Sequence, residues 1–166
     1  MKMRAALCAA MIAACVGCSN LSARPADLNA SINDRSIPIE VSGPHSRERA
    51  RTVIRFLKAF ASSDPNELKE TVTADFTWHL HVGEGDFRGR TVSGVDGIMQ
   101  VKEERRSDWS NVNYSNIRLF VADNRVVQTY RVTGDSRRYG AFDANGVDLY
   151  LVRDGRVAIK DSYWKQ

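Results

Sequence analysis

The C-terminal third of the chain most restricts the possible folds, because it consists of consecutive strand-like segments. Four segments alternate apolar and polar residues with a period of two, namely residues 112–121, 125–133, 143–153 and 156–163. Turn-forming residues separate them at Asp123-Asn124, Gly134 to Gly140 and Asp154-Gly155. Strands joined by such short connections pair in an antiparallel sheet. A sheet of this kind buries one face, so the rest of the chain must cover it.

The segment before these strands has helical spacing. A first helix is predicted from Ser46, a good N-cap, because apolar residues recur every three or four positions at Ala50, Val53, Ile54, Leu57 and Phe60 or Ala61. A second, shorter helix is predicted at Asp64-Pro65-Asn66-Glu67, where Asp caps, Pro occupies the first position and an acid follows. Leu68 and Val72 would form its buried face.

One strand and one further helix complete the pattern. Residues 76–82 alternate apolar and polar side chains, and Gly83, Gly85 and Gly89 mark turns after them. Ser93 is predicted to cap a third helix that ends in the charged run 102–106, expected to be solvated. The order is helix, helix, strand, helix and four strands. It predicts an α+β fold with three helices on one face of a curved, mostly antiparallel sheet.

The first 17 residues are predicted to be a secretory signal peptide. Lys2 and Arg4 form a charged start, and residues 5–17 carry no charge. This run is too short to span a bilayer, which needs about 20 apolar residues, but it matches an export signal. Without those two cations, 22 basic residues face 20 acidic ones. Such a balance and the absence of any basic aromatic stripe do not favour nucleic-acid binding.

All three cysteines, Cys8, Cys15 and Cys18, lie at the N-terminus, so the mature domain has no intrachain disulfide and no Cys-based metal site. The segment Cys15–Cys18 resembles the lipobox of bacterial lipoproteins. That resemblance implies a lipid on Cys18 and a protein held at the periplasmic face of a membrane, with Ser19 favouring the outer membrane. The alternative is ordinary cleavage after residues 21–23, which would release a soluble protein.

The predicted organisation has three parts. Residues 1–17 are the signal peptide, and residues 18–45 are the lipidated cysteine and a flexible tether, which includes an extended piece at Ile37 to Val41. Residues 46–166 are the folded domain.

This domain resembles the SnoaL-like branch of the nuclear transport factor 2-like superfamily. The resemblance lies in three stretches: Arg55 to Leu68, Ala74 to Trp78, and Val152 to Val157 followed by Tyr163-Trp164. It implies a cone in which a bent sheet wraps around helices and leaves an apolar pocket at the open end. Members include isomerases, cyclases, epoxide hydrolases, dehydratases and plain binding modules, so the fold alone does not define a function.

The family's known catalytic sets are incomplete in this sequence. The steroid isomerases use a carboxylate base, a Tyr and a protonated acid. Alignment places Leu80 at the base, Phe56 at the Tyr, Asp148 at the acid and Trp164 at a pocket Trp. Proton abstraction beside a carbonyl needs a base, so this mechanism is not expected.

The epoxide hydrolases use two acids and an Arg. Here Arg131 aligns with the Arg, but Thr133 and Ser162 stand where the acids are expected. Two of the three members are therefore missing, and this mechanism is not expected either.

The pocket is predicted to be lined by Trp78, Leu80, Tyr150 and Trp164, with Asp148, Lys160 and Ser162 as polar members. A glycine-bulged turn at Asp154-Gly155 would place Asp148 opposite Lys160, whereas a two-residue turn would shift the pairing by one and expose the other face.

Asp148 has two interpretations. It is either a buried acid donor with a raised pKa, or a structural carboxylate whose pKa is lowered by Lys160 or Arg131.

These residues predict a binding module for a small lipophilic molecule or a partner segment. One alternative is an isomerase, cyclase or hydrolase that uses Asp148 as acid or base, and another is a structural homodimer formed through the sheet. No cofactor is expected. His79 and His81 should point away from the pocket, and the absence of a third ligand nearby argues against a metal site.

Overall fold

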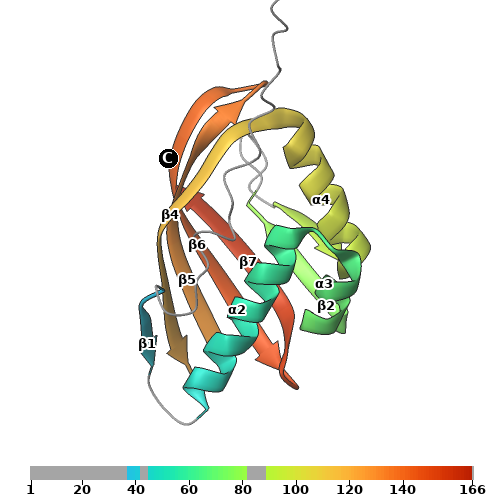
Figure 1. Cartoon of the computed structure of the whole chain (residues 1–166), viewed down its shortest axis with the longest axis vertical. Helices are drawn as coiled ribbons and strands as arrows, with labels where there is room; N and C mark the ends of the chain where they lie inside the picture. Colours follow the sequence, from blue (N-terminus) through green and yellow to red (C-terminus); the bar gives the residue numbers. More distant parts are fainter. Residues whose placement is uncertain (1–36, 42–44, 82–88, 166) are drawn as a thin grey trace, which may run out of the picture.

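The computed structural model describes residues 37–41, 45–81 and 89–165 (Figure 1). The predicted signal peptide, Cys18 and most of the tether lie outside these residues. Within the described part of the chain, no helix has the length and apolar character needed to cross a membrane.

In the described residues, three helices pack against one seven-stranded sheet. The helices are α2 (Ser46–Ser62), α3 (Pro65–Thr71) and α4 (Gly94–Asp108). The strands are β1 (Ile39–Val41), β2 (Val72–Leu80), β3 (Arg90–Ser93), β4 (Trp109–Ala122), β5 (Arg125–Ser136), β6 (Gly140–Arg153) and β7 (Arg156–Lys165).

The sheet has the order β1-β4-β5-β6-β7-β2-β3. All neighbours are antiparallel except the pairs β1–β4 and β2–β7. The long strands curve, and α2, α3 and α4 lie on the same side of them (Figure 1). The predicted α+β architecture is confirmed. Its core lies between the helices and the inward face of the sheet.

Helix α2 contributes the centre of this core. Phe56 is fully buried, and its ring centroid lies 5.9–6.0 Å from those of Phe60, Phe76 and Tyr150. Burial of a Phe side chain contributes about 1.5–3 kcal/mol, and the tilted and edge-on ring geometries add to that. The position at which steroid isomerases carry a Tyr is therefore part of the packing between α2 and the sheet.

The helix termini confirm two predicted cap positions, Asp64 and Ser93, and correct a third. Asp64 caps α3, because its Oδ1 accepts a hydrogen bond of 2.8 Å from the Asn66 backbone nitrogen. The prediction for α2 was wrong, since His45 is the N-cap, with φ of 62°, and Ser46 is a buried first helical residue.

The charged end of α4 is more buried than predicted. Lys102 Nζ donates to the Phe60 carbonyl oxygen and lies 4.2 Å from the centre of the Phe60 ring. Arg105 stacks on Trp78 and Trp109, with Cζ 5.0 and 4.7 Å from the ring centres. Long cationic side chains cover apolar surface with their methylene groups. A run of charged residues in the sequence therefore does not show that this end of the helix is fully exposed to solvent.

One connection and one short strand differ from the prediction. The segment Gly134 to Gly140 is not a loop, since β5 continues to Ser136 and β6 begins at Gly140, and the two residues pair. The Ser136 hydroxyl accepts hydrogen bonds from two backbone nitrogens of the three-residue turn, which allows so tight a connection. Strand β3 was not predicted, because its four residues are too few to show a period.

The hairpin between β6 and β7 has the two-residue turn that was the alternative prediction, followed by a bulge that was not predicted. Asp154 and Gly155 form a two-residue turn with φ of 52° and 68°. The glycine bulge predicted at this turn, and with it the direct pairing of Asp148 and Lys160, was wrong. Instead an extra residue, Ala158, lies between the pairs Val152–Val157 and Leu151–Ile159.

Because this bulge shifts the pairing by one residue, the side chains of β7 that were predicted to face the core do so beyond it. Beyond it Tyr150 pairs with Lys160, and Asp148 pairs with Ser162. The predicted inward-facing set is therefore retained although the turn differs.

Candidate functional site

A row of buried polar residues crosses the inward face of the sheet. Gln128 of β5 pairs with Asp148 of β6, which pairs with Ser162 of β7. All three are at most 5% exposed. In the next row Tyr150 pairs with Lys160, which pairs with Trp78 of β2. Residues two apart on a strand share a face, so these side chains converge under the helices.

A buried ion pair lies at the centre of this face. Lys160 Nζ is 2.6 Å from Asp148 Oδ2, and each side chain is 6% exposed. Lys160 also donates to Ser162 Oγ at 2.6 Å, and the same oxygen accepts from Trp78 Nε1 at 2.9 Å. Such a pair is stable only when further hydrogen bonds compensate for the lost hydration. Here Ser162 of β7 and Trp78 of β2 supply them.

Tyrosine hydroxyls surround the carboxylate of Asp148. Tyr130 OH donates to Oδ1 at 3.3 Å and accepts from Trp164 Nε1 at 2.8 Å. Tyr150 OH lies 3.2 Å from Oδ2 and donates to Gln128 Oε1 at 2.7 Å. Burial and the nearby Asp148 charge raise the pKa of both tyrosines. They therefore remain protonated donors at neutral pH.

Burial lowers the pKa of two lysines, whereas it raises the pKa of the tyrosines. It lowers the pKa of Lys160 to about 8, although Asp148 opposes the shift, and it lowers the pKa of Lys102 to about 8 as well. The ordinary value is 10.5. Both ammonium groups are thus less favourable in the folded protein than in the unfolded chain.

We expect the free energy of unfolding to rise as the pH increases from about 8 to about 10. In this range the unfolded chain binds more protons at Lys102 and Lys160 than the folded protein does, so removing protons favours folding. Above pH 10 stability should fall, because Tyr130 and Tyr150 ionise first in the unfolded chain. Urea titrations at successive pH values measure this. A Lys102→Met/Lys160→Met variant should lose the rise, and a flat wild-type profile would contradict the prediction.

A small cavity lies beside the ion pair, with a volume of about 40 Å³. Its lining comprises Leu57, Phe60, Trp78, Arg105, Tyr114, Gln128, Tyr130, Asp148, Lys160 and Ser162. Polar cavities of this size hold a few waters, whereas drug-sized ligands need about 300–1,000 Å³. The apolar hollow expected from the sequence is therefore narrower and more polar. A ligand must be small or must displace a side chain.

Arg105 is the lining side chain best placed to move. It is half-buried, and its guanidinium lies within 5.8 Å of the ring centres of Trp78, Trp109 and Trp164. Among the described residues no carboxylate forms an ion pair with it. With Lys160 it gives the lining two cations against the single carboxylate of Asp148.

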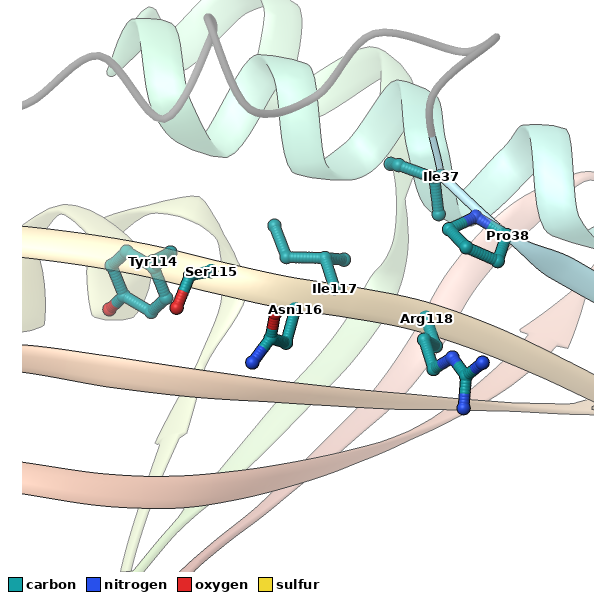
Figure 2. Close-up of a pocket in the computed structure, with 7 residues that line it drawn as sticks. All are labelled: Ile37, Pro38, Tyr114, Ser115, Asn116, Ile117 and Arg118. Carbon is teal, nitrogen blue, oxygen red and sulfur yellow. The ribbon is translucent and has the colours of Figure 1, made fainter.

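A larger hollow of about 680 Å³ lies at the edge of the sheet (Figure 2). It is lined by Ile37, Pro38, Tyr114, Ser115, Asn116, Ile117 and Arg118. Strand β4 bulges here, where Asn116 has φ of 54° and the pairing with β5 shifts. The hollow contains no buried titratable cluster among its described residues, but it shares Tyr114 with the inner cavity.

The structure brings most of the predicted pocket together. Trp78, Asp148, Lys160 and Ser162 line the cavity, and Tyr150 and Trp164 hydrogen-bond to its lining residues. Leu80 is half-buried at the end of β2 and is not among the lining side chains.

Sequence reasoning missed Gln128, Tyr130, Tyr114 and Arg105. The alternation of residues 125–133 places Gln128 and Tyr130 on the face of the buried Val126, so their inward direction was available. Arg105 gave no such signal, because it belongs to a charged run.

Other candidate residues lie elsewhere. Arg131 pairs with Asp143 on the exposed face, so Lys160 is the partner of Asp148. His79 and His81 are exposed, and His79 Nδ1 is 2.9 Å from Thr91 Oγ1. Within residues 37–41, 45–81 and 89–165, no group of three or more His, Cys, Asp or Glu side chains could hold a metal ion.

Comparison with known proteins gives one family and many similar folds. The sequence model of the SnoaL-like domain matches residues 53–159. An NTF2-like protein of unknown function from Mesorhizobium loti is 21% identical, with a TM-score of 0.60, and the alignment covers 78% of this chain and 100% of that one. No curated protein sequence matches the chain.

Two further solved structures carry functional names. A putative SnoaL-like polyketide cyclase from Jannaschia sp. CCS1 is 17% identical, with a TM-score of 0.60 and coverage of 75% of this chain and 90% of that one. A putative isomerase from Bacillus subtilis is 15% identical, with a TM-score of 0.55 and coverage of 72% and 87%. At these identities the similarity establishes the fold.

Proposed function

Because the chain belongs to the SnoaL-like domain family, we propose that it binds a small, partly apolar molecule in the cavity beside Asp148 and Lys160. The observation that carries this proposal is the ion pair itself, since its two side chains are buried and both line the cavity. A buried ion pair is often no more stabilising than apolar residues of the same volume. Its placement on a cavity wall therefore favours recognition over packing.

The lining indicates what kind of molecule fits. Phe60, Trp78 and Tyr114 offer aromatic walls, while Lys160 and Ser162 offer polar atoms beside Trp78. Pockets of this type bind apolar groups and orient them through a few polar contacts. Displacement of Arg105 from its tryptophan stack would enlarge the space.

We expect a library of small lipophilic compounds to contain ligands that raise the melting temperature of the protein. Lys160→Met should weaken their binding about 10-fold or more, because a hydrogen bond to a charged group contributes about 1.5–3 kcal/mol. Calorimetry measures this, and His79→Ala, on the opposite face, is the matched control. If no compound shifts the melting temperature, and no molecule copurifies by native mass spectrometry, the binding function is wrong.

A second candidate is acid–base catalysis by Asp148. It is favoured by the two tyrosine hydroxyls around this carboxylate and by the cyclase and isomerase names of similar structures. The positions of the family's base and of its Tyr hold Leu80 and Phe56, which supports binding over catalysis. Asp148→Asn should abolish turnover while the circular dichroism spectrum is retained. Unchanged turnover would reject catalysis by Asp148.

We also propose that the domain is exported and anchored to the periplasmic face of a membrane through a lipid on Cys18. The charged start, the short uncharged run and the lipobox-like segment support this. Intact mass of the membrane fraction should reveal a diacylglyceryl adduct on Cys18, and Cys18→Ser should move the protein to the soluble fraction. A soluble wild-type protein that begins after Ala23 would instead establish ordinary signal cleavage.

A further inference from the structure

The cavity contains a nucleophile that simple binding does not use. Of the described lysines, Lys160 is the one that lines it. Lys160 is 5% exposed, and its Nζ is held by Asp148 and Ser162 at 2.6 Å each. A lysine amine becomes a good nucleophile when it is desolvated or lies near another cation. Lys160 meets both conditions.

Arg105 supplies the neighbouring cation. Its Cζ and Lys160 Nζ lie 5.0 and 4.8 Å from the centre of the same Trp78 ring. The positive charge of Arg105 adds to burial in lowering the pKa of Lys160. Asp148 Oδ2, at 2.6 Å, is positioned to accept the proton that the ammonium must lose. The proton acceptor Asp148, the amine of Lys160 and the cation Arg105 thus line the same cavity.

We propose that Lys160 forms a Schiff base with a small aldehyde or ketone that carries a carboxylate, and that Arg105 binds this carboxylate. The inference deepens the proposed binding function and depends on it. The carboxylate follows from the charge of the described lining residues, among which two cations face one acid. The small size follows from the cavity volume of about 40 Å³, which favours compounds of a few heavy atoms.

The step balances without an oxidant or reductant. Asp148 takes one proton from the Lys160 ammonium, and the neutral amine attacks the carbonyl carbon to form a C–N bond. The carbonyl electron pair moves to oxygen, which receives a proton from the nitrogen. Asp148 then returns its proton to the hydroxyl, which leaves as water while C=N forms. The product is a protonated imine opposite the Asp148 carboxylate.

The test is reductive trapping with glyoxylate, the smallest molecule that has both an aldehyde and a carboxylate. The full chain is treated briefly with glyoxylate and cyanoborohydride near pH 7.5, and each lysine is followed by peptide mass mapping. Lys160 should be modified about 10-fold faster than Lys102. Lys102 is the matched comparison, because burial lowers its pKa to the same value and it does not line the cavity. Equal rates at Lys160, Lys102 and the exposed Lys58 would overturn the proposal.

Two variants separate the roles of the neighbouring groups. Asp148→Asn should slow modification of Lys160 by any aldehyde. Arg105→Gln should slow modification by propanal, which has no carboxylate, to a small extent, because it removes the cation that helps to lower the pKa of Lys160. It should slow modification by glyoxylate considerably more, because it also removes the partner of the carboxylate. Equal loss with both aldehydes in Arg105→Gln would overturn the assignment of the carboxylate to Arg105.

An experiment without the reductant distinguishes the absence of a Schiff base from the absence of ligand binding. Native mass spectrometry without the reductant detects non-covalent ligands in the wild type. If lipophilic ligands bind there while Lys160 is not trapped, the Schiff base is wrong and the binding function stands.

Discussion

Replacement of Asp148 by alanine will lower the free energy of unfolding by about 3–5 kcal/mol. Asp148 is 4% exposed, and its carboxylate pairs with Lys160 at 2.6 Å. Its removal leaves the buried ammonium of Lys160 with the Ser162 hydroxyl as its remaining hydrogen-bond acceptor among the described residues, and it also removes the acceptor of the Tyr130 hydroxyl. Urea denaturation at pH 7 measures the loss.

The double variant Asp148→Leu/Lys160→Met is the informative companion. Apolar residues of similar volume avoid the desolvation of both charges, so this variant should recover most of the lost stability. Asp143→Ala provides the surface control, because Asp143 pairs with Arg131 where both are about half exposed, and its loss should be small. A single Asp148→Ala variant as stable as the wild type would show that Lys160 is not held in a dry environment.

Replacement of Gly146 by alanine will be the second severe change, with a loss of about 2–3 kcal/mol. An alanine Cβ at this position would lie 2.2 Å from Cζ of the Tyr130 ring and 2.7 Å from its hydroxyl oxygen. Gly146 pairs with Tyr130 on one side and Trp164 on the other. The ring must therefore turn away, which breaks the hydrogen bonds of its hydroxyl to Asp148 and Trp164.

A double-mutant cycle tests this cause. Tyr130→Ala removes the ring that collides with the new methyl group, so Gly146→Ala should cost much less in a Tyr130→Ala background than in the wild type. Denaturation of the four proteins gives the coupling free energy. If the two losses simply add, the contact between Gly146 and Tyr130 does not explain the effect.

The local elements of this protein are encoded in short stretches of its sequence. The four C-terminal strands and the helix at residues 46–62 follow from periods of two and 3.6, which depend on neighbouring residues alone. For the same reason the shared face of Asp148 and Tyr150 was predictable, and so was the cap at Asp64, whereas the place of Lys160 on that face depended on the register of the hairpin. Boundaries were less certain where pairing extends a strand, as at Ser136.

The tertiary structure decided how these elements meet. The bulge at Ala158 determines that Asp148 pairs with Ser162, and no local pattern marks it, because a bulge is a property of the pairing between two strands. Arg105 reaches the cavity from a charged helix end, and the volume of that cavity depends on described side chains from α2, α4 and five strands. Periodicity acts between neighbours in the chain, whereas register, cavity shape and the partners of a buried charge depend on residues brought together by folding.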